Sequence, residues 1–179
     1  MKLKLICSLA LSLLLVFSRV SAQNHASTIR TQAMDMANSL INNKFETFVR
    51  YMHPAIIEMA GGKENMQTKM DSAYRTMKRF NVRFKRYWIG KPSEVLEYKN
   101  TLQSVLPQIT IMNTPLGEVF AESAMIVISE DNGKNWWFID TNAYDMEKIK
   151  TALPDLSPNL VVPPRKKPVI TRKFPNNEN

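Results

Sequence analysis

The hydrophobic period of the chain changes once, near Asn81, and this change limits the possible folds more than any other feature. Before Asn81, small and apolar residues recur in steps of three and four, which predicts helices over residues 26–41, 44–52 and 63–80. After it, apolar and polar residues alternate in segments separated by short turns, which predicts β-strands. Strands joined by short turns pair antiparallel. Helices followed by a meandering antiparallel sheet indicate an α+β fold.

Several local features refine this outline. The apolar segment AIIEMA, residues 55–60, is expected to form a short strand, because Pro54 ends the second helix. Gly61 and Gly62 then turn the chain into the third helix. The inward face of that helix is predicted to hold Met66, Met70, Ala73, Met77 and Phe80. Within the strands, Pro107 indicates an edge position or a bulge, because proline has no backbone N–H for the ladder.

The first 22 residues predict a signal peptide. Two lysines precede an apolar run over residues 5–17, and residues 20–22 (VSA) place small side chains at the expected cleavage site. The protein is therefore expected to be secreted or periplasmic. Its only cysteine, Cys7, lies in this segment, so no disulfide is expected after cleavage. No later apolar stretch is long enough to cross a bilayer, so no integral membrane segment is expected.

The net charge of +8 is concentrated outside the central part of the chain. The predicted signal peptide has three basic residues and no acidic one, and the segment after Val162 has five basic residues and one acidic residue. We expect one α+β domain over residues 23–153 and a proline-rich basic tail over residues 154–179, extended or disordered. This tail could contact an anionic surface. Nucleic acid is not an expected partner, because export removes the protein from most of it.

The most patterned stretch is SEDNGKNWWFID, residues 129–140, whose spacing of Ser, Asp, Gly and Trp resembles the Asp-box of sialidases and other β-propellers. A propeller needs several such repeats in a far longer chain. The stretch is therefore interpreted as a hairpin turn, with Asp131 bonded to turn amides and Gly133 at a positive φ. Because side chains alternate along a strand, only one of Trp136 and Trp137 is expected to face the interior.

The order of the elements resembles that of the nuclear transport factor 2-like, or SnoaL-like, superfamily. The local matches are RYMHPAII at residues 50–57, similar to a helix end that runs into the first strand, and SEDNGKNWWFID, similar to the last hairpin. The resemblance covers about residues 26–142 and implies N-terminal helices packed on a curved antiparallel sheet that forms a cone. The superfamily includes isomerases, dehydratases, epoxide hydrolases and non-catalytic members, so the fold does not decide the function. The Asp-Tyr pair of the ketosteroid isomerase type and the Asp-Arg-Asp set of the epoxide hydrolase type cannot be placed on this sequence.

Three residues are candidates for catalysis: His53, Glu58 and Glu122. His53 could act as a general base, because the ordinary pKa of histidine lies near neutrality. At a helix end it could equally make a structural contact with the last carbonyls. Glu58 lies further along the chain than His53, within the short strand predicted for residues 55–60. Glu122 alternates in step with Ala124 and Ile126, so it is expected to face inward, where burial would raise the pKa of its carboxyl.

A mainly apolar pocket is expected between the helices and the concave sheet. Its predicted lining residues are Tyr51, Met59, Trp88, Trp136 and Trp137. The methionines are spaced like core residues of helices and not like copper ligands; if they line the pocket, they favour a pliable one. The interleaved basic and aromatic residues of RTMKRFNVRFKRYW, residues 75–88, are interpreted as a solvated face, with a modest anion site as the alternative. No metal-ligand cluster or phosphate loop is recognised, so no metal or other cofactor is expected.

These observations together favour a non-catalytic binding protein for a small apolar or amphipathic ligand or for a partner protein. The alternative is a small lyase, isomerase or hydrolase that uses His53 and a carboxylate in the pocket. The sequence does not indicate an oligomeric state.

Overall fold

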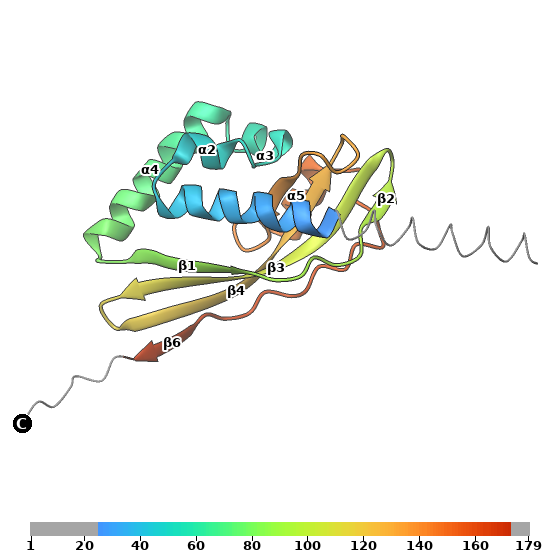
Figure 1. The fold of residues 1–179 in the computed structure, drawn as a ribbon. Helices are drawn as coiled ribbons and strands as arrows, with labels where there is room; N and C mark the ends of the chain where they lie inside the picture. Colours follow the sequence, from blue (N-terminus) through green and yellow to red (C-terminus); the bar gives the residue numbers. More distant parts are fainter. Residues whose placement is uncertain (1–24, 173–179) are drawn as a thin grey trace, which may run out of the picture.

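The computed structural model of the protein describes residues 25–172. The predicted signal peptide, residues 1–22, and the end of the predicted tail, residues 173–179, lie outside the described residues. Figure 1 shows the N-terminal helices on one side of three long strands, with the C-terminal segment running along the other side.

The first helix covers residues 25–41 of the described chain. The later helices are α2 (Phe45–Val49), α3 (Pro54–Met59), α4 (Lys63–Arg79) and α5 (Met146–Ala152). The strands are β1 (Arg83–Ile89), β2 (Leu96–Tyr98), β3 (Thr101–Thr114), β4 (Gly117–Ser129), β5 (Trp137–Asp140) and β6 (Val169–Arg172). No helix among the described residues has both the length and the apolar content needed to cross a membrane.

The described strands form one open sheet in which all strand pairs are antiparallel. The main order is β1-β3-β4-β5, with β2 beside β3 and β6 beside β4. The β3–β4 hairpin turns through Pro115 and Leu116, between the paired residues Thr114 and Gly117. The expected combination of helices with an antiparallel sheet is confirmed, and the fold is α+β.

Two apolar clusters bury the end of the sheet formed by β4 and β5 on both faces. Helix 25–41 covers the face that we call the inner face, where Met125 and Val127 of β4 pack against Ile29 and Ala33. The opposite face is the outer face, where Ile126 and Ile128 pack with Ile56 of α3 and Ile149 of α5. Helices α2 and α4 reach both faces, because the chain after α2 runs beside β5, where Met52 pairs with Phe138. Val49 and Met66 join the outer-face cluster, and Phe48 also packs against the inner-face cluster. Each such fully buried side chain stabilises the fold by about 1.5–3 kcal/mol. This double cover buries Phe138 and Ile139 of β5 on opposite faces.

Residues 55–59 belong to helix α3 (Pro54–Met59), so the prediction of a strand over residues 55–60 was wrong. α3 begins with Pro54, whose ring fixes the φ that a first helical turn requires. His53 caps this helix, because its Nδ1 accepts a hydrogen bond from the Ala55 amide at 3.2 Å. Only Ile56 of the six helical residues is fully buried, which fits one inward stripe. The preceding helix, α2, ends at Val49 and is shorter than the predicted helix over residues 44–52, and Pro54 starts the next helix.

The apolar face predicted for the third helix is buried only near its beginning. Met66 is buried, whereas Ala73 is exposed and Phe80 is 60% exposed. The last turns of α4 run past the end of α2 (Figure 1), so no other helix covers them. The helical spacing was correct, but the sequence did not show how much of the helix would be covered.

Two features of the strands depart from simple alternation. The register of β1 against β3 shifts between Phe84 and Arg86, which marks a β-bulge at Lys85. Phe84 and Tyr87 consequently share a face and stack with their ring centroids 5.8 Å apart. The prediction of an edge position for Pro107 was wrong, since β3 lies between β1 and β4. Pro107 is tolerated there because the β1 ladder ends beside it, where its carbonyl accepts from the Gly90 amide at 2.8 Å.

Residues 129–136 form the turn between β4 and β5. Asp131 Oδ1 accepts from the Asn135 amide at 2.9 Å, and the Gly133 amide donates to Ser129 Oγ at 2.9 Å. Gly133 has φ of 83°, a region that favours glycine. Trp136 Nε1 donates to the Gly133 carbonyl at 3.0 Å, which ties the buried indole to the turn.

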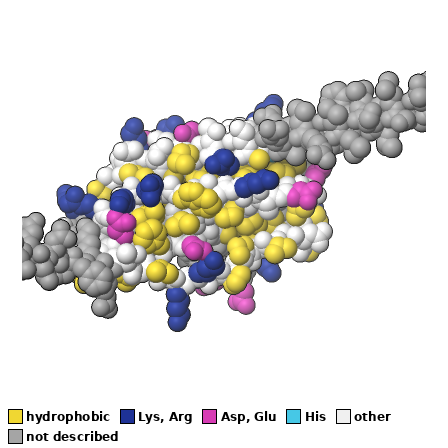
Figure 2. Space-filling view, turned by 60° about the horizontal axis from the view of Figure 1, so that its bottom comes forward, with side chains coloured by type: hydrophobic (Ala, Val, Ile, Leu, Met, Phe, Trp, Pro, Cys, Tyr) yellow, Lys and Arg dark blue, Asp and Glu magenta, His cyan; other side chains and the backbone are white. Residues whose placement is uncertain are grey.

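The C-terminal segment packs on the domain well past Leu153, where the predicted domain ends. Buried Gln103 of β3 accepts from the Ser157 amide and donates to the Asp155 carbonyl, both at 2.8 Å. Leu156, Leu160 and Val162 then pack against the outer-face cluster. Residues 161–168 have no regular secondary structure, whereas the proline-free residues 169–172 form a ladder with β4 as β6. Figure 2 turns the lower side of the molecule in Figure 1 toward the viewer and shows hydrophobic side chains along its middle.

Candidate functional site

An apolar pocket of about 240 Å³ lies between the inner face of the sheet and helices 25–41, α2 and α4. Its walls are mainly thioether and aromatic side chains: Met36, Met52, Met66, Met70, Met125, Phe48, Tyr87, Phe138 and Tyr144. Two hydrogen-bonded polar side chains, Gln108 of β3 and Asp140 of β5, also line it. The described pocket is therefore an apolar chamber with one polar side.

The sheet register brings this polar pair together. Gln108 is opposite Ser123 on β4, and Asp140 is opposite Met125, so all four side chains lie on the inner face. Gln108 Nε2 donates to Asp140 Oδ2 at 3.2 Å and to Ser123 Oγ at 2.9 Å. The Asn142 amide donates to Asp140 Oδ1 at 2.8 Å. The carboxylate is thus held in place by one side-chain and one backbone donor.

Burial raises the pKa of the Asp140 carboxyl above its ordinary value. The hydrogen bonds from Asn142 and Gln108 and the positive charge of Arg165 lower this pKa, but burial has the larger effect. Burial also raises the pKa of the Tyr87 hydroxyl, and the charge of Asp140 adds to that rise. Both acidic groups therefore keep their protons to a higher pH than they would in water.

Arg165 of the C-terminal segment clamps the loop that forms one rim of the pocket. Its Nε donates to the Thr141 carbonyl at 2.8 Å, and its Nη2 donates to the Tyr144 carbonyl at 2.7 Å. The same Nη2 lies 3.1 Å from Asp145 Oδ1. Ala143 and Tyr144, which lie between these contacts, line the pocket. The segment predicted to be a separate tail therefore supports the site.

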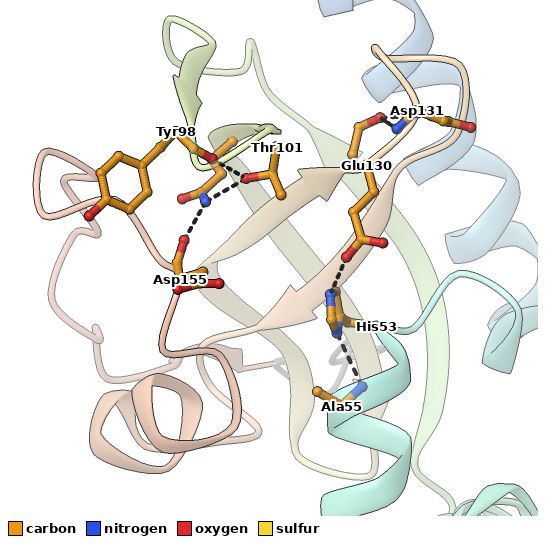
Figure 3. Close-up of polar contacts among 9 residues, drawn as sticks. His53, Ala55, Tyr98, Thr101, Glu130, Asp131 and Asp155 are labelled. Atoms are coloured by element: carbon orange, nitrogen blue, oxygen red, sulfur yellow. Dashed lines mark hydrogen bonds and ion pairs between the residues drawn. The ribbon is translucent and has the colours of Figure 1, made fainter.

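His53 is buried, with 7% of its surface exposed, but it does not line the described pocket. Figure 3 shows its ring between the Ala55 amide and the Glu130 carboxylate, whose Oε1 lies 3.8 Å from Nε2. The ring also meets Trp137 edge-on, with centroids 5.1 Å apart. Burial lowers the pKa of His53 to about 4. The imidazole is therefore neutral near pH 7 and serves as the cap of α3.

The other two catalytic candidates lie elsewhere. Glu58 lines a shallow groove between α3 and α5, together with Met59. Glu122 lies on the outer face, in a groove of about 250 Å³ that also includes the 54%-exposed Trp88, and it pairs with Lys166. The structure therefore does not bring His53, Glu58 and Glu122 together in any described cavity.

The remaining predicted pocket residues do not line the pocket. Tyr51 packs edge-on against Phe138, with ring centroids 6.2 Å apart. Trp136 is only 1% exposed and fills the inner-face core, whereas Trp137 lies half-buried on the outer face against His53. The two tryptophans do lie on opposite faces, as the alternation requires. Methionines form the pocket walls where the sequence predicted these aromatic residues.

Asp140, Gln108 and Tyr87 are the polar residues that sequence reasoning missed. The alternation that placed Glu122 in step with Ile126 was correct, since both lie on one face. That face is the outer one, and at Glu122 no helix covers it. Asp140 follows Phe138 by two residues, so the alternation predicts that they share a face. The sequence did not show which face of the sheet would enclose a pocket.

Comparison of the chain with models of known protein families, with curated proteins and with solved structures finds no match. Within the described residues, no group of three or more His, Cys, Asp and Glu side chains is arranged to hold a metal ion.

Proposed function

We propose that this protein binds a small, mainly apolar ligand in the pocket lined by the five methionines. The observation that carries the proposal is a preformed chamber of about 240 Å³ with apolar walls and one fixed polar pair. Small-molecule sites typically combine apolar walls with a few placed polar groups. The volume equals that of about eight water molecules at ~30 Å³ each, so it suits a small molecule and excludes a folded partner.

The methionine walls favour a ligand whose shape need not match one rigid cavity. Thioether side chains have several rotatable bonds and adjust to irregular shapes. Met36, Met66 and Met70 come from two helices and Met125 from the sheet, so the wall can adapt on more than one side. A flexible apolar wall with a single polar anchor favours binding by shape and burial over multiple hydrogen bonds.

We further propose that the domain is exported, on the basis of residues 1–22, and that it is a SnoaL-like domain. An open antiparallel sheet with helices on its inner face supports the cone-shaped arrangement that the resemblance implies. The basic C-terminal segment remains our proposed contact with an anionic surface.

A small lyase or isomerase is the second candidate, and Asp140 is the observation that favours it. A carboxyl whose pKa is raised by burial in an apolar pocket is a candidate for proton transfer. Such an enzyme would use Asp140 and Tyr87 in place of His53, Glu58 and Glu122, which open into different places.

The binding proposal is tested by NMR with ¹³C-labelled methionine methyl groups and the neutral probe 3-phenylpropan-1-ol. Signals of Met36, Met52, Met66, Met70 and Met125 are expected to shift together, while those of the 39%-exposed Met34 and Met59 outside the pocket stay in place. An Ala143→Trp variant, altered at the exposed rim, is expected to block these shifts. Equal shifts at all methionines, or none in the pocket, would overturn the proposal.

A further inference from the structure

The charge of the pocket is one-sided. Among its lining residues, Asp140 is the only carboxyl, and no lysine, arginine or histidine of the described chain lines it. The other polar residues in the lining are Tyr87, Tyr144 and Gln108. A ligand that enters therefore meets one acidic group and no basic one.

The Asp140 carboxylate also keeps acceptor capacity. An ionised carboxylate has about four acceptor positions, and Gln108 and the Asn142 amide occupy two of them. No cationic nitrogen of the described residues lies within 4 Å of it. Arg165, whose positive charge lowers the pKa of Asp140, directs its donors to the Thr141 and Tyr144 carbonyls and to Asp145. The carboxylate therefore has no ion-pair partner of its own.

The walls next to this carboxylate suit an organic cation. Tyr87, Tyr144, Phe48 and Phe138 present aromatic rings to the pocket, and ring faces attract cations through their quadrupoles. Thioethers are polarisable and apolar, so they accommodate the hydrocarbon body of such a ligand. A carboxylate ligand, by contrast, would face Asp140 with no basic side chain to compensate.

We propose that the ligand is an amphipathic amine, a small apolar molecule with one ammonium group that pairs with the Asp140 carboxylate. This inference rests on the proposed function, since it concerns the same pocket. The ammonium takes the unoccupied acceptor positions of Asp140, and the apolar body packs among the methionines. Charge-assisted hydrogen bonds of this kind are about twice as strong as neutral ones.

The groups that face Asp140 determine how this binding depends on pH. They are Gln108 and the Asn142 amide, which do not titrate, the Tyr87 hydroxyl of β1, and Arg165 of the C-terminal segment, which stays charged. Asp140 is therefore the group whose ionisation changes in the acidic range. Amine binding is expected to strengthen as the pH rises and Asp140 loses its proton.

The test uses three probes with one carbon skeleton: 3-phenylpropan-1-amine, 3-phenylpropan-1-ol and 3-phenylpropanoate. Their Kd values are measured at pH 7.5 by methionine-methyl NMR on the full mature chain. The amine is expected to bind about tenfold more tightly than the alcohol, and the carboxylate more weakly than either. Asp140→Asn, which keeps the side-chain shape, is expected to remove the preference for the amine over the alcohol. Glu130→Gln, which removes a carboxylate outside the pocket, is the matched control and should keep the preference.

The outcomes separate the two proposals. Equal affinity for amine and alcohol, or a preference that persists in Asp140→Asn, overturns the amine proposal and leaves the binding function standing. Absence of pocket binding by all three probes overturns both.

Discussion

Gln108 Nε2 lies 3.2 Å from Asp140 Oδ2, and this contact joins two strands that are not neighbours, β3 and β5, across β4. The bond stabilises the ionised carboxylate, and so it lowers the pKa that burial raises. Replacing Gln108 by methionine keeps an unbranched side chain and removes the donor. The pKa of Asp140 is then expected to rise further, which a ¹³C NMR titration of the carboxyl carbon would detect. An unchanged pKa would show that Gln108 does not act on the carboxylate.

The titration of His53 should contribute to the pH dependence of the free energy of unfolding. The unfolded imidazole has a pKa near 6.5, whereas burial lowers the folded value to about 4. Between these values the unfolded state binds more protons, so the stability from this group is complete above pH 6.5 and is lost as the pH falls toward 4. The loss amounts to roughly 3 kcal/mol.

His53→Asn keeps an acceptor at the N-cap and removes the titration. The difference in free energy of unfolding between pH 7.5 and pH 4.5 is therefore expected to shrink in this variant, measured by urea denaturation. A variant with the same pH dependence as the wild type would contradict the assignment.

Arg165→Ala should loosen the rim of the pocket. The substitution removes the donors to the Thr141 and Tyr144 carbonyls and the contact with Asp145. Hydrogen bonds from a charged group contribute about 1.5–3 kcal/mol each, so amide exchange in residues 141–145 is expected to quicken by more than about tenfold. Lys167→Ala removes a nearby positive charge and serves as the control. Equal exchange in the two variants would mean that charge alone, and not the clamp, holds the loop.

Asp131→Ala should weaken the β4–β5 turn. Asp131 Oδ1 accepts from the Asn135 amide at 2.9 Å, and its Oδ2 accepts from the Asn135 side chain at 2.6 Å. Loss of these bonds is expected to lower the free energy of unfolding by about 1–2 kcal/mol. Asp131→Asn keeps one acceptor and should lose less. Urea denaturation followed by tryptophan fluorescence measures both, and equal losses in the two variants would argue against the acceptor role.

The hydrophobic periods predicted the class of fold because each element buries one continuous stripe or face. They failed where the same residue is compatible with two different local structures. Pro54 was expected to end a helix, but in the structure it starts α3, and at Lys85 a bulge reverses the alternation of β1. Neither event changes the composition of its segment, so no count of apolar residues distinguishes it.

The site was harder to predict than the fold, because it depends on which sheet face is enclosed. Alternation correctly separates Glu122 from Asp140, but only tertiary packing decides that helix 25–41 covers the face of Asp140. The role of Arg165 could not be predicted from the sequence for the same reason. Its clamp on residues 141–145 exists only because Gln103 first docks the preceding segment on β3.

The late position of β6 in the chain has a consequence for the order of folding. The β3–β4 hairpin closes through a two-residue turn, whereas β6 pairs with β4 only after a segment that contains β5 and α5, with Val169 opposite Phe120. Contacts between residues far apart in sequence form later than local ones. Until the end of the chain arrives, the edge of β4 at residues 117–120 has unpaired N–H and C=O groups, and such an edge is a template for another chain. Pairing of the C-terminal strand with β4 therefore covers this edge and protects the nascent protein from aggregation.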